Sequence, residues 1–187
     1  MPNAVKLPHK LDRKTMTCQA VIETPKGARS KFDYDEESGL FRLAGLLPEG
    51  MSFPVDFGFF PSTEAQDGDP LDVMVLHDEP IQTAALVTIR LIGVIEGDQT
   101  EEGNTVRNDR LLAVTTCSHQ YEQITEVEQL GKLFVDHLTK FWVNYNDVKN
   151  KTFDVRGVYG SDRAADALEK AAEAATARAS PISLGAG

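Results

Sequence analysis

The sequence is poor in cysteine, in positive charge and in long hydrophobic runs. Its two cysteines, Cys18 and Cys117, do not have the spacing of metal ligands, which favours two reduced thiols in a cytoplasmic protein. No segment is long and apolar enough to cross a bilayer, and the first residues lack the apolar core of a signal peptide. We therefore expect a soluble protein located in the cytoplasm.

Lysine and arginine total 19 residues against 29 for aspartate and glutamate, which gives a net charge of -10. Nucleic acids and anionic membranes attract positively charged surfaces, so we expect neither as a partner. An anionic substrate would instead need a local cluster of metal ions, lysine and arginine. The 187 residues, 41% of them hydrophobic, are enough for one domain with a real core.

Short runs with strand-like patterning dominate the first two thirds of the chain. They predict strands at 17–23, 31–34, 40–43, 73–76, 86–96, 111–115 and 153–159. The aromatic segment 53–61 is interpreted as irregular and buried in the core. Residues 97–104 are acidic and rich in turn formers, which predicts a hairpin-like loop.

Two helices are predicted in the last third. Thr125 and Glu128 have the spacing of a capping box, and apolar residues then recur every three or four positions until about Tyr145. Ser161 or Asp162 should cap an alanine-rich helix that runs to about Arg178 and packs lightly, because its apolar face is small.

Several strands followed by helices predict an α+β fold, a small OB-like β-barrel with flanking α-helices. We expect residues 1–187 to form a single domain, with a surface arm at 1–16 and a frayed tail at 180–187.

Three carboxylates, Asp67, Asp69 and Asp72, lie within six residues that also contain Gly68 and Pro70. Aspartate, glycine and proline are common in turns, so an acidic surface loop is one interpretation. However, carboxylates this close repel one another unless a cation neutralises them, and the apolar strand that follows would hold them in place. Mg²⁺ prefers oxygen ligands and is often shared with substrate phosphates. The segment therefore predicts a metal site for chemistry on a phosphate.

This motif and its surroundings resemble those of soluble family I inorganic pyrophosphatases, over roughly residues 17–170. An early Glu and Lys of the family site match Glu23 and Lys31, the next family Glu corresponds to Asp33, and a late Tyr matches Tyr145. The resemblance implies Mg²⁺-dependent hydrolysis of diphosphate to two orthophosphates, with Mn²⁺ or another divalent cation as an alternative. It also implies a homo-oligomer, a hexamer by analogy.

The chain departs from the family where phosphate contacts are expected. An Arg, a Tyr and a Lys of the family are replaced by Gly45, Phe57 and Asn146. In the longer second acidic segment the last metal-binding Asp falls on Asn108 or, with a slip of one residue, on Asp109. Each lost charged hydrogen bond removes about 1.5–3 kcal/mol of transition-state binding. Turnover would then depend on compensation by nearby cations, namely Arg42, Arg107 and Arg110.

The resemblance implies the following roles. The metal ligands would be Glu23, Asp33, Asp67, Asp69, Asp72 and Asn108 or Asp109. Substrate would be bound by Lys31, Arg42, Arg107, Arg110 and Tyr145. Asp69 as general base, with Lys31, Arg110 and Tyr145, would carry catalysis. The departures leave two alternatives open: a catalytically impaired or repurposed metal- and phosphate-binding protein, and a hydrolase of another phosphoanhydride.

Overall fold

The computed structural model describes residues 3–179, and the predicted tail at 180–187 lies outside that range. The strands are β1 (Thr17–Thr24), β2 (Ser30–Asp35), β3 (Leu40–Leu46), β4 (Asp56–Phe59), β5 (Asp72–Leu76), β6 (Leu86–Glu101), β7 (Asn104–Arg107), β8 (Arg110–Thr115) and β9 (Thr152–Gly160). The helices are α1 (Lys132–Asp147) and α2 (Ser161–Ala179), with short 3₁₀ turns at Ala4–Lys6 and Val127–Leu130.

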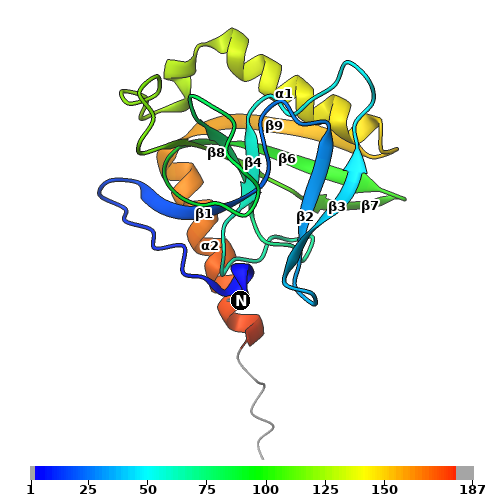
Figure 1. Ribbon diagram of the computed structural model, residues 1–187, viewed down its shortest axis with the longest axis horizontal. Coiled ribbons are helices and arrows are strands. Elements are labelled where there is room, and N and C mark those ends of the chain that lie inside the picture. Colours follow the sequence, from blue (N-terminus) through cyan, green and yellow to red (C-terminus); the bar gives the residue numbers. More distant parts are fainter. Residues whose placement is uncertain (1–2, 180–187) are drawn as a thin grey trace, which may run out of the picture.

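Five strands close into a ring. β1 pairs with β4, β4 with β5, β5 with β8, β8 with β6, and β6 again with β1 (Figure 1). The predicted α+β fold with an OB-like barrel is confirmed. A separate β2–β3 hairpin stands beside the barrel, and β7 and β9 pair with the far half of β6.

The long strand β6 corrects one prediction. We expected the strand to end at Glu96 and a loop to follow, but β6 continues to Glu101 and turns into β7 at Gly103. The reason is tertiary, because β9 pairs with β6 from Gly93 to Thr100 and satisfies its backbone groups. The residues of β6 alone do not indicate this pairing.

The segment 53–61 is buried, as predicted, but the irregular part is shorter than expected because β4 lies within it. Gly58 allows β4 to approach β1 closely. A Cβ atom at this position would lie 1.9 Å from the carbonyl oxygen of Val21, so no larger residue fits without a shift of the backbone.

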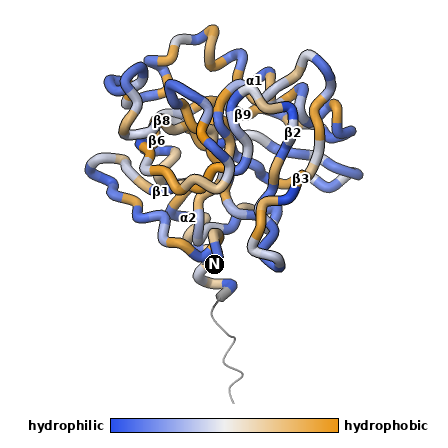
Figure 2. Tube along the Cα trace, viewed as in Figure 1, coloured by the Kyte–Doolittle hydropathy of each residue, from blue (hydrophilic) through white to orange (hydrophobic). Residues whose placement is uncertain are grey.

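Two cores lie on the two faces of the central strands. Alternate residues of β5 point to opposite sides, with Val73 and Val75 in one core and Met74 and Leu76 in the other. Figure 2 shows hydrophobic stretches along the strands in the middle of the molecule and mostly hydrophilic loops around them.

Helix α2 covers the first core more tightly than its small apolar face suggested. Ala164, Ala165 and Leu168 have no exposed surface and pack with barrel residues such as Ile22 and Leu91. The prediction of light packing was wrong because alanine side chains let the helix axis approach the strands.

Helix α1 covers the second core through Leu138 and Trp142. It begins at Lys132, later than the capping-box pattern suggested, because Gly131 has a φ of 80° and separates it from the preceding 3₁₀ turn. The observed box caps that turn instead, with Glu126 as N-cap and Gln129 as its partner. Among residues 3–179, no helix has the length and apolarity needed to span a membrane.

Candidate active site

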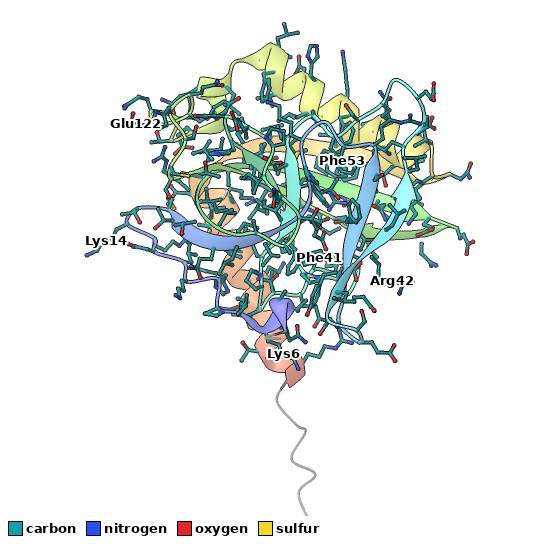
Figure 3. All side chains as sticks on the ribbon, viewed as in Figure 1. Lys6, Lys14, Phe41, Arg42, Phe53 and Glu122 are labelled. Carbon is teal, nitrogen blue, oxygen red and sulfur yellow. The ribbon has the colours of Figure 1, made fainter. Side chains whose placement is uncertain are left out.

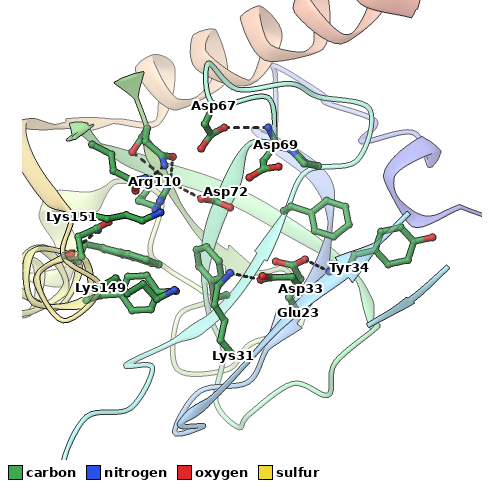
Figure 4. A pocket seen from close by; sticks show the side chains of 18 of the residues that line it. Glu23, Lys31, Asp33, Tyr34, Asp67, Asp69, Asp72, Arg110, Lys149 and Lys151 are labelled. Atoms are coloured by element: carbon green, nitrogen blue, oxygen red, sulfur yellow. Dashed lines mark hydrogen bonds and ion pairs between the residues drawn. The ribbon is translucent and has the colours of Figure 1, made fainter. Parts of the chain in front are cut away.

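A cavity of about 290 Å³ opens beside the barrel, between β1, β2, β5, β8 and the end of α1 (Figure 4). Its lining includes most of the residues expected from the sequence. These are Glu23, Lys31, Asp33, Asp67, Asp69, Asp72, Asn108, Arg110 and Tyr145. Residues from both ends of the chain therefore meet in one pocket.

The three aspartates reach this pocket from a turn and the strand that follows it. Gly68 has a φ of 89°, and the Asp67 carboxylate accepts a hydrogen bond from the backbone N–H of Asp69 at 3.2 Å. Asp72 is the first residue of β5 and lies opposite Arg110 in the parallel pairing with β8. Its Oδ2 lies 2.5 Å from Nη1 of Arg110.

Burial raises the pKa of three carboxyl groups of the pocket, those of Glu23, Asp69 and Asp72. Burial raises the pKa of Asp72 to about 6 and that of Glu23 to about 8. Burial, together with the negative charge of Asp67, raises the pKa of Asp69. A bound cation would favour the charged forms of all these groups.

The donor set fits a hard divalent cation. Among residues 3–179, no three Asp, Glu, His or Cys side chains already surround one ion position. Mg²⁺ usually takes only one or two carboxylates and completes its shell with water and substrate phosphate oxygens. Carboxylate oxygens that face a pocket lined by cations are the expected ligands for an ion bound together with a phosphate.

Arg110 is the most constrained cation of the pocket. Its side chain is 5% exposed, contacts Asp72 and the side-chain oxygen of Asn108, and places its guanidinium carbon 4.7 Å from the ring centroid of Trp142. Across the described range, its Nε has no hydrogen-bond partner. A buried donor without a partner next to an open pocket is suited to bind an oxygen of a ligand.

Three of the expected residues lie elsewhere. Arg42 is on the outer side of the β2–β3 hairpin, where its side chain is 71% exposed and 3.8 Å from the carboxylate of Asp35 (Figure 3). Arg107 and Asp109 line a neighbouring cavity, where Arg107 is ion-paired with both Asp109 and Glu96.

The second acidic segment had two possible alignments, with Asn108 or Asp109 as the metal-binding residue, and these two residues line different cavities. Along residues 107–110 the side chains alternate between the two cavities, so Asn108 and Arg110 face the pocket of the three aspartates while their neighbours face away.

Sequence reasoning did not identify Gln99, Lys149 and Lys151, which also line the pocket. Lys149 follows Tyr145 by four residues, and its Nζ donates a hydrogen bond to the Tyr145 hydroxyl at 2.6 Å. This helical spacing was a usable signal, because residues four apart lie on the same face of a helix. Lys151 lies 2.7 Å from Glu101, a contact that depends on the β6–β7 hairpin and has no local signal.

The raised pKa of Glu23 predicts how the stability of the metal-free protein depends on pH. Its ordinary pKa is 4.5 and its folded pKa about 8, so between these values the folded state keeps a proton that the unfolded state has released. The free energy of unfolding should therefore fall as pH rises from about 5 to about 8, on the order of a few kcal/mol. Urea unfolding with a chelator present measures it.

Glu23→Gln should flatten this dependence, whereas Glu37→Gln, at an exposed turn between β2 and β3, should leave it unchanged. Saturating Mg²⁺ should also flatten it by favouring the ionised carboxylate. A Gln variant with the same slope as the parent protein would show that Glu23 is already ionised without metal.

Comparison with known proteins identifies the family of this chain. A sequence model of the family described as inorganic pyrophosphatase matches residues 20–176. An inorganic pyrophosphatase from Methanosarcina acetivorans is 32% identical over 151 residues, which cover 81% of this chain and 88% of the relative. One from Corynebacterium glutamicum is 34% identical over 143 residues, covering 76% of this chain and 87% of the relative.

The structural comparison extends the likeness to the whole barrel. The crystal structure of inorganic pyrophosphatase from Thermus thermophilus superposes with a TM-score of 0.84 at 26% identity, and covers 93% of this chain and 99% of that one. This chain belongs to the inorganic pyrophosphatase family.

Proposed function

We propose that the protein hydrolyses inorganic diphosphate to two orthophosphates with Mg²⁺ as its cofactor, and that the pocket of the three aspartates is the active site. One observation carries this proposal most directly. The carboxylates of Asp67, Asp69 and Asp72 face the same cavity as the cations of Lys31 and Arg110. Such a site has acidic groups for divalent cations and basic groups for the phosphate oxygens of the substrate.

Within this proposal the metal ligands are drawn from Glu23, Asp33, Asp67, Asp69, Asp72 and Asn108. When bound, divalent cations neutralise the diphosphate and lower the pKa of water, with Mn²⁺ as a possible substitute for Mg²⁺. Asp69, in the turn that precedes β5, accepts the proton of the attacking water.

The cations and the phenol bind the substrate. Lys31, on β2, and Arg110, on β8, neutralise the phosphoryl oxygens, and Tyr145 donates its hydroxyl from the end of α1. Because little covalent chemistry is left to the protein, most of the rate enhancement comes from positioning and electrostatics.

Arg107 and Asp109 take a supporting role in this proposal. The ion pairs of Arg107 with Asp109 and with Glu96 hold the segment that presents Asn108 and Arg110 to the pocket. Arg42 has no role at the site, because it lies on the outer side of the hairpin.

A second candidate is hydrolysis of another phosphoanhydride. It is favoured by Phe57, which lines the pocket but has no hydroxyl, and by Asn146, whose side-chain amide is bound to the carbonyl of Trp142 at 2.9 Å. Fewer fixed contacts to phosphate leave more freedom for a substituted substrate. A binding protein without turnover is the third candidate and has the same observations behind it.

Phosphate release from a panel of substrates tests these candidates. With Mg²⁺ in excess, we expect diphosphate to be cleaved with a kcat/KM at least about a hundredfold higher than ATP or ADP, because the acidic and basic groups around the cavity suit two phosphoryl groups and their ions. Preference for a nucleotide would support the second candidate instead.

We also propose that the protein forms a homo-oligomer in the cytoplasm. Exposed leucines of β3 support the assembly, because Leu40, Leu43 and Leu46 of this one strand are 58%, 66% and 68% exposed. Light scattering after size exclusion tests it, and a hexamer is the expected size by analogy. A monomer at micromolar concentration would reject the assembly but not the activity.

A further inference from the structure

One lysine of the pocket lacks the kind of partner that the other cations have. Three lining cations form ion pairs with carboxylates: Lys31 with Asp33, Arg110 with Asp72, and Lys151 with Glu101. Lys149 also lines the pocket but, within residues 3–179, forms no ion pair with a carboxylate. Its charge is therefore available to a ligand.

The end of α1 directs Lys149 toward the pocket. The helix ends at Asp147, and the backbone N–H of Lys149 bonds to the carbonyl of Asn146 at 2.9 Å, so the chain stays coiled for one further turn. The Lys149 Nζ then lies 2.6 Å from the hydroxyl of Tyr145 and 4.3 Å from its ring centroid. In Figure 4 the side chain lies on the opposite side of the pocket from Glu23 and Asp33.

The neighbouring Asn146 cannot supply a charge at this place. Asn146 is only 1% exposed, and its side-chain nitrogen donates a hydrogen bond to the backbone carbonyl of Trp142 in the same helix at 2.9 Å. In the family that this chain resembles, the corresponding position is expected to be lysine. The positive charge next to Tyr145 therefore comes from Lys149, three positions further along the chain and just beyond the end of α1.

The electrostatic surroundings favour an anion at this point. Burial and the positive charge of Lys31 lower the pKa of Lys149 to about 8. An oxyanion placed between the two ammonium groups would remove their repulsion, and it would also take a hydrogen bond from the tyrosine hydroxyl.

We propose that Lys149, together with Tyr145, binds one phosphoryl group of the substrate and takes the place of the lysine that is missing at position 146. The proposal deepens the diphosphatase function and rests on it for the identity of the substrate. The site also binds the product, orthophosphate, which gives a test that does not depend on turnover.

The test compares Lys149→Met and Lys149→Arg with a control, Lys140→Met. Lys140 is an exposed lysine of α1 that does not line the pocket. Binding of orthophosphate, in the presence of Mg²⁺, is measured by calorimetry, and KM and kcat are measured with diphosphate. Circular dichroism confirms that each variant is folded, which we expect because Lys149 belongs to neither hydrophobic core.

We expect Lys149→Met to weaken orthophosphate binding and to raise KM about tenfold to a hundredfold, as the loss of one charged hydrogen bond implies. Lys149→Arg should recover most of that loss, and Lys140→Met should behave like the parent protein. Unchanged orthophosphate binding in Lys149→Met would overturn the proposal. If the parent protein does not cleave diphosphate, the proposed function fails, and the binding measurement still decides the role of Lys149.

Discussion

Asp72→Asn should abolish Mg²⁺-dependent release of phosphate from diphosphate, with a loss of kcat on the order of a thousandfold. Asp72 begins β5 beside the barrel core and faces the same cavity as Asp67 and Asp69. The amide keeps the shape of the carboxylate but removes its charge, and a neutral oxygen binds a hard divalent cation much more weakly. Steady-state phosphate release at saturating Mg²⁺ measures the effect.

The matched control is Asp154→Asn, at an exposed position of β9 that does not line the pocket. It should keep the activity of the parent protein. Mg²⁺ binding by calorimetry should weaken in the Asp72 variant and not in the control. Full activity in a folded Asp72→Asn protein would place the metal site elsewhere in the chain.

Replacing Arg110 should have the second largest effect. Arg110→Met removes the guanidinium that pairs with Asp72 and lies over Trp142, and it leaves a buried carboxylate without its cation. We expect kcat/KM for diphosphate to fall about a hundredfold to a thousandfold, since a preorganised charge at the phosphoryl group is lost. The free energy of unfolding should fall as well, by roughly 1–3 kcal/mol, because one partner of a mostly buried pair is removed.

Arg110→Lys distinguishes the effect of the positive charge from the effect of the planar guanidinium shape. Lysine keeps the positive charge, so the variant should keep far more activity than Arg110→Met, although it loses the planar contact with Trp142 and the second nitrogen of the fork. Kinetics and urea unfolding of both variants measure the two effects together. Equal kinetics in the parent, Lys and Met proteins would exclude Arg110 from substrate binding.

The strands were predictable where their signal is local. Runs such as 17–23 and 111–115 alternate or are β-branched, and they became β1 and β8 within one residue of the expected bounds. The end of β6 and the start of α1 were not predictable in this way. The first depends on pairing with β9, which lies some fifty residues away in the chain, and the second on the positive φ of Gly131.

The same distinction between local and tertiary signals applies to the residues of the site. The three aspartates form a local motif, so their shared pocket followed from the sequence and the resemblance. Asn108 lines the pocket of the three aspartates and Asp109 does not, because side chains alternate between the two cavities after β7. The residue types alone do not indicate which of the two lines this pocket. Lys149 had a local signal in its four-residue spacing from Tyr145, whereas the place of Lys151 depends on Glu101 of the β6–β7 hairpin, a tertiary contact.

Phosphate release from diphosphate by the purified protein, measured with and without Mg²⁺, tests the central claim most directly. We predict rapid release with Mg²⁺ and almost none after chelation, because the buried carboxylates of Asp72 and Glu23 and the cations around them require a metal to bring the substrate into reacting position. No release by a folded protein that still binds Mg²⁺ would contradict the claim and leave a pocket that binds metal and phosphate without turnover.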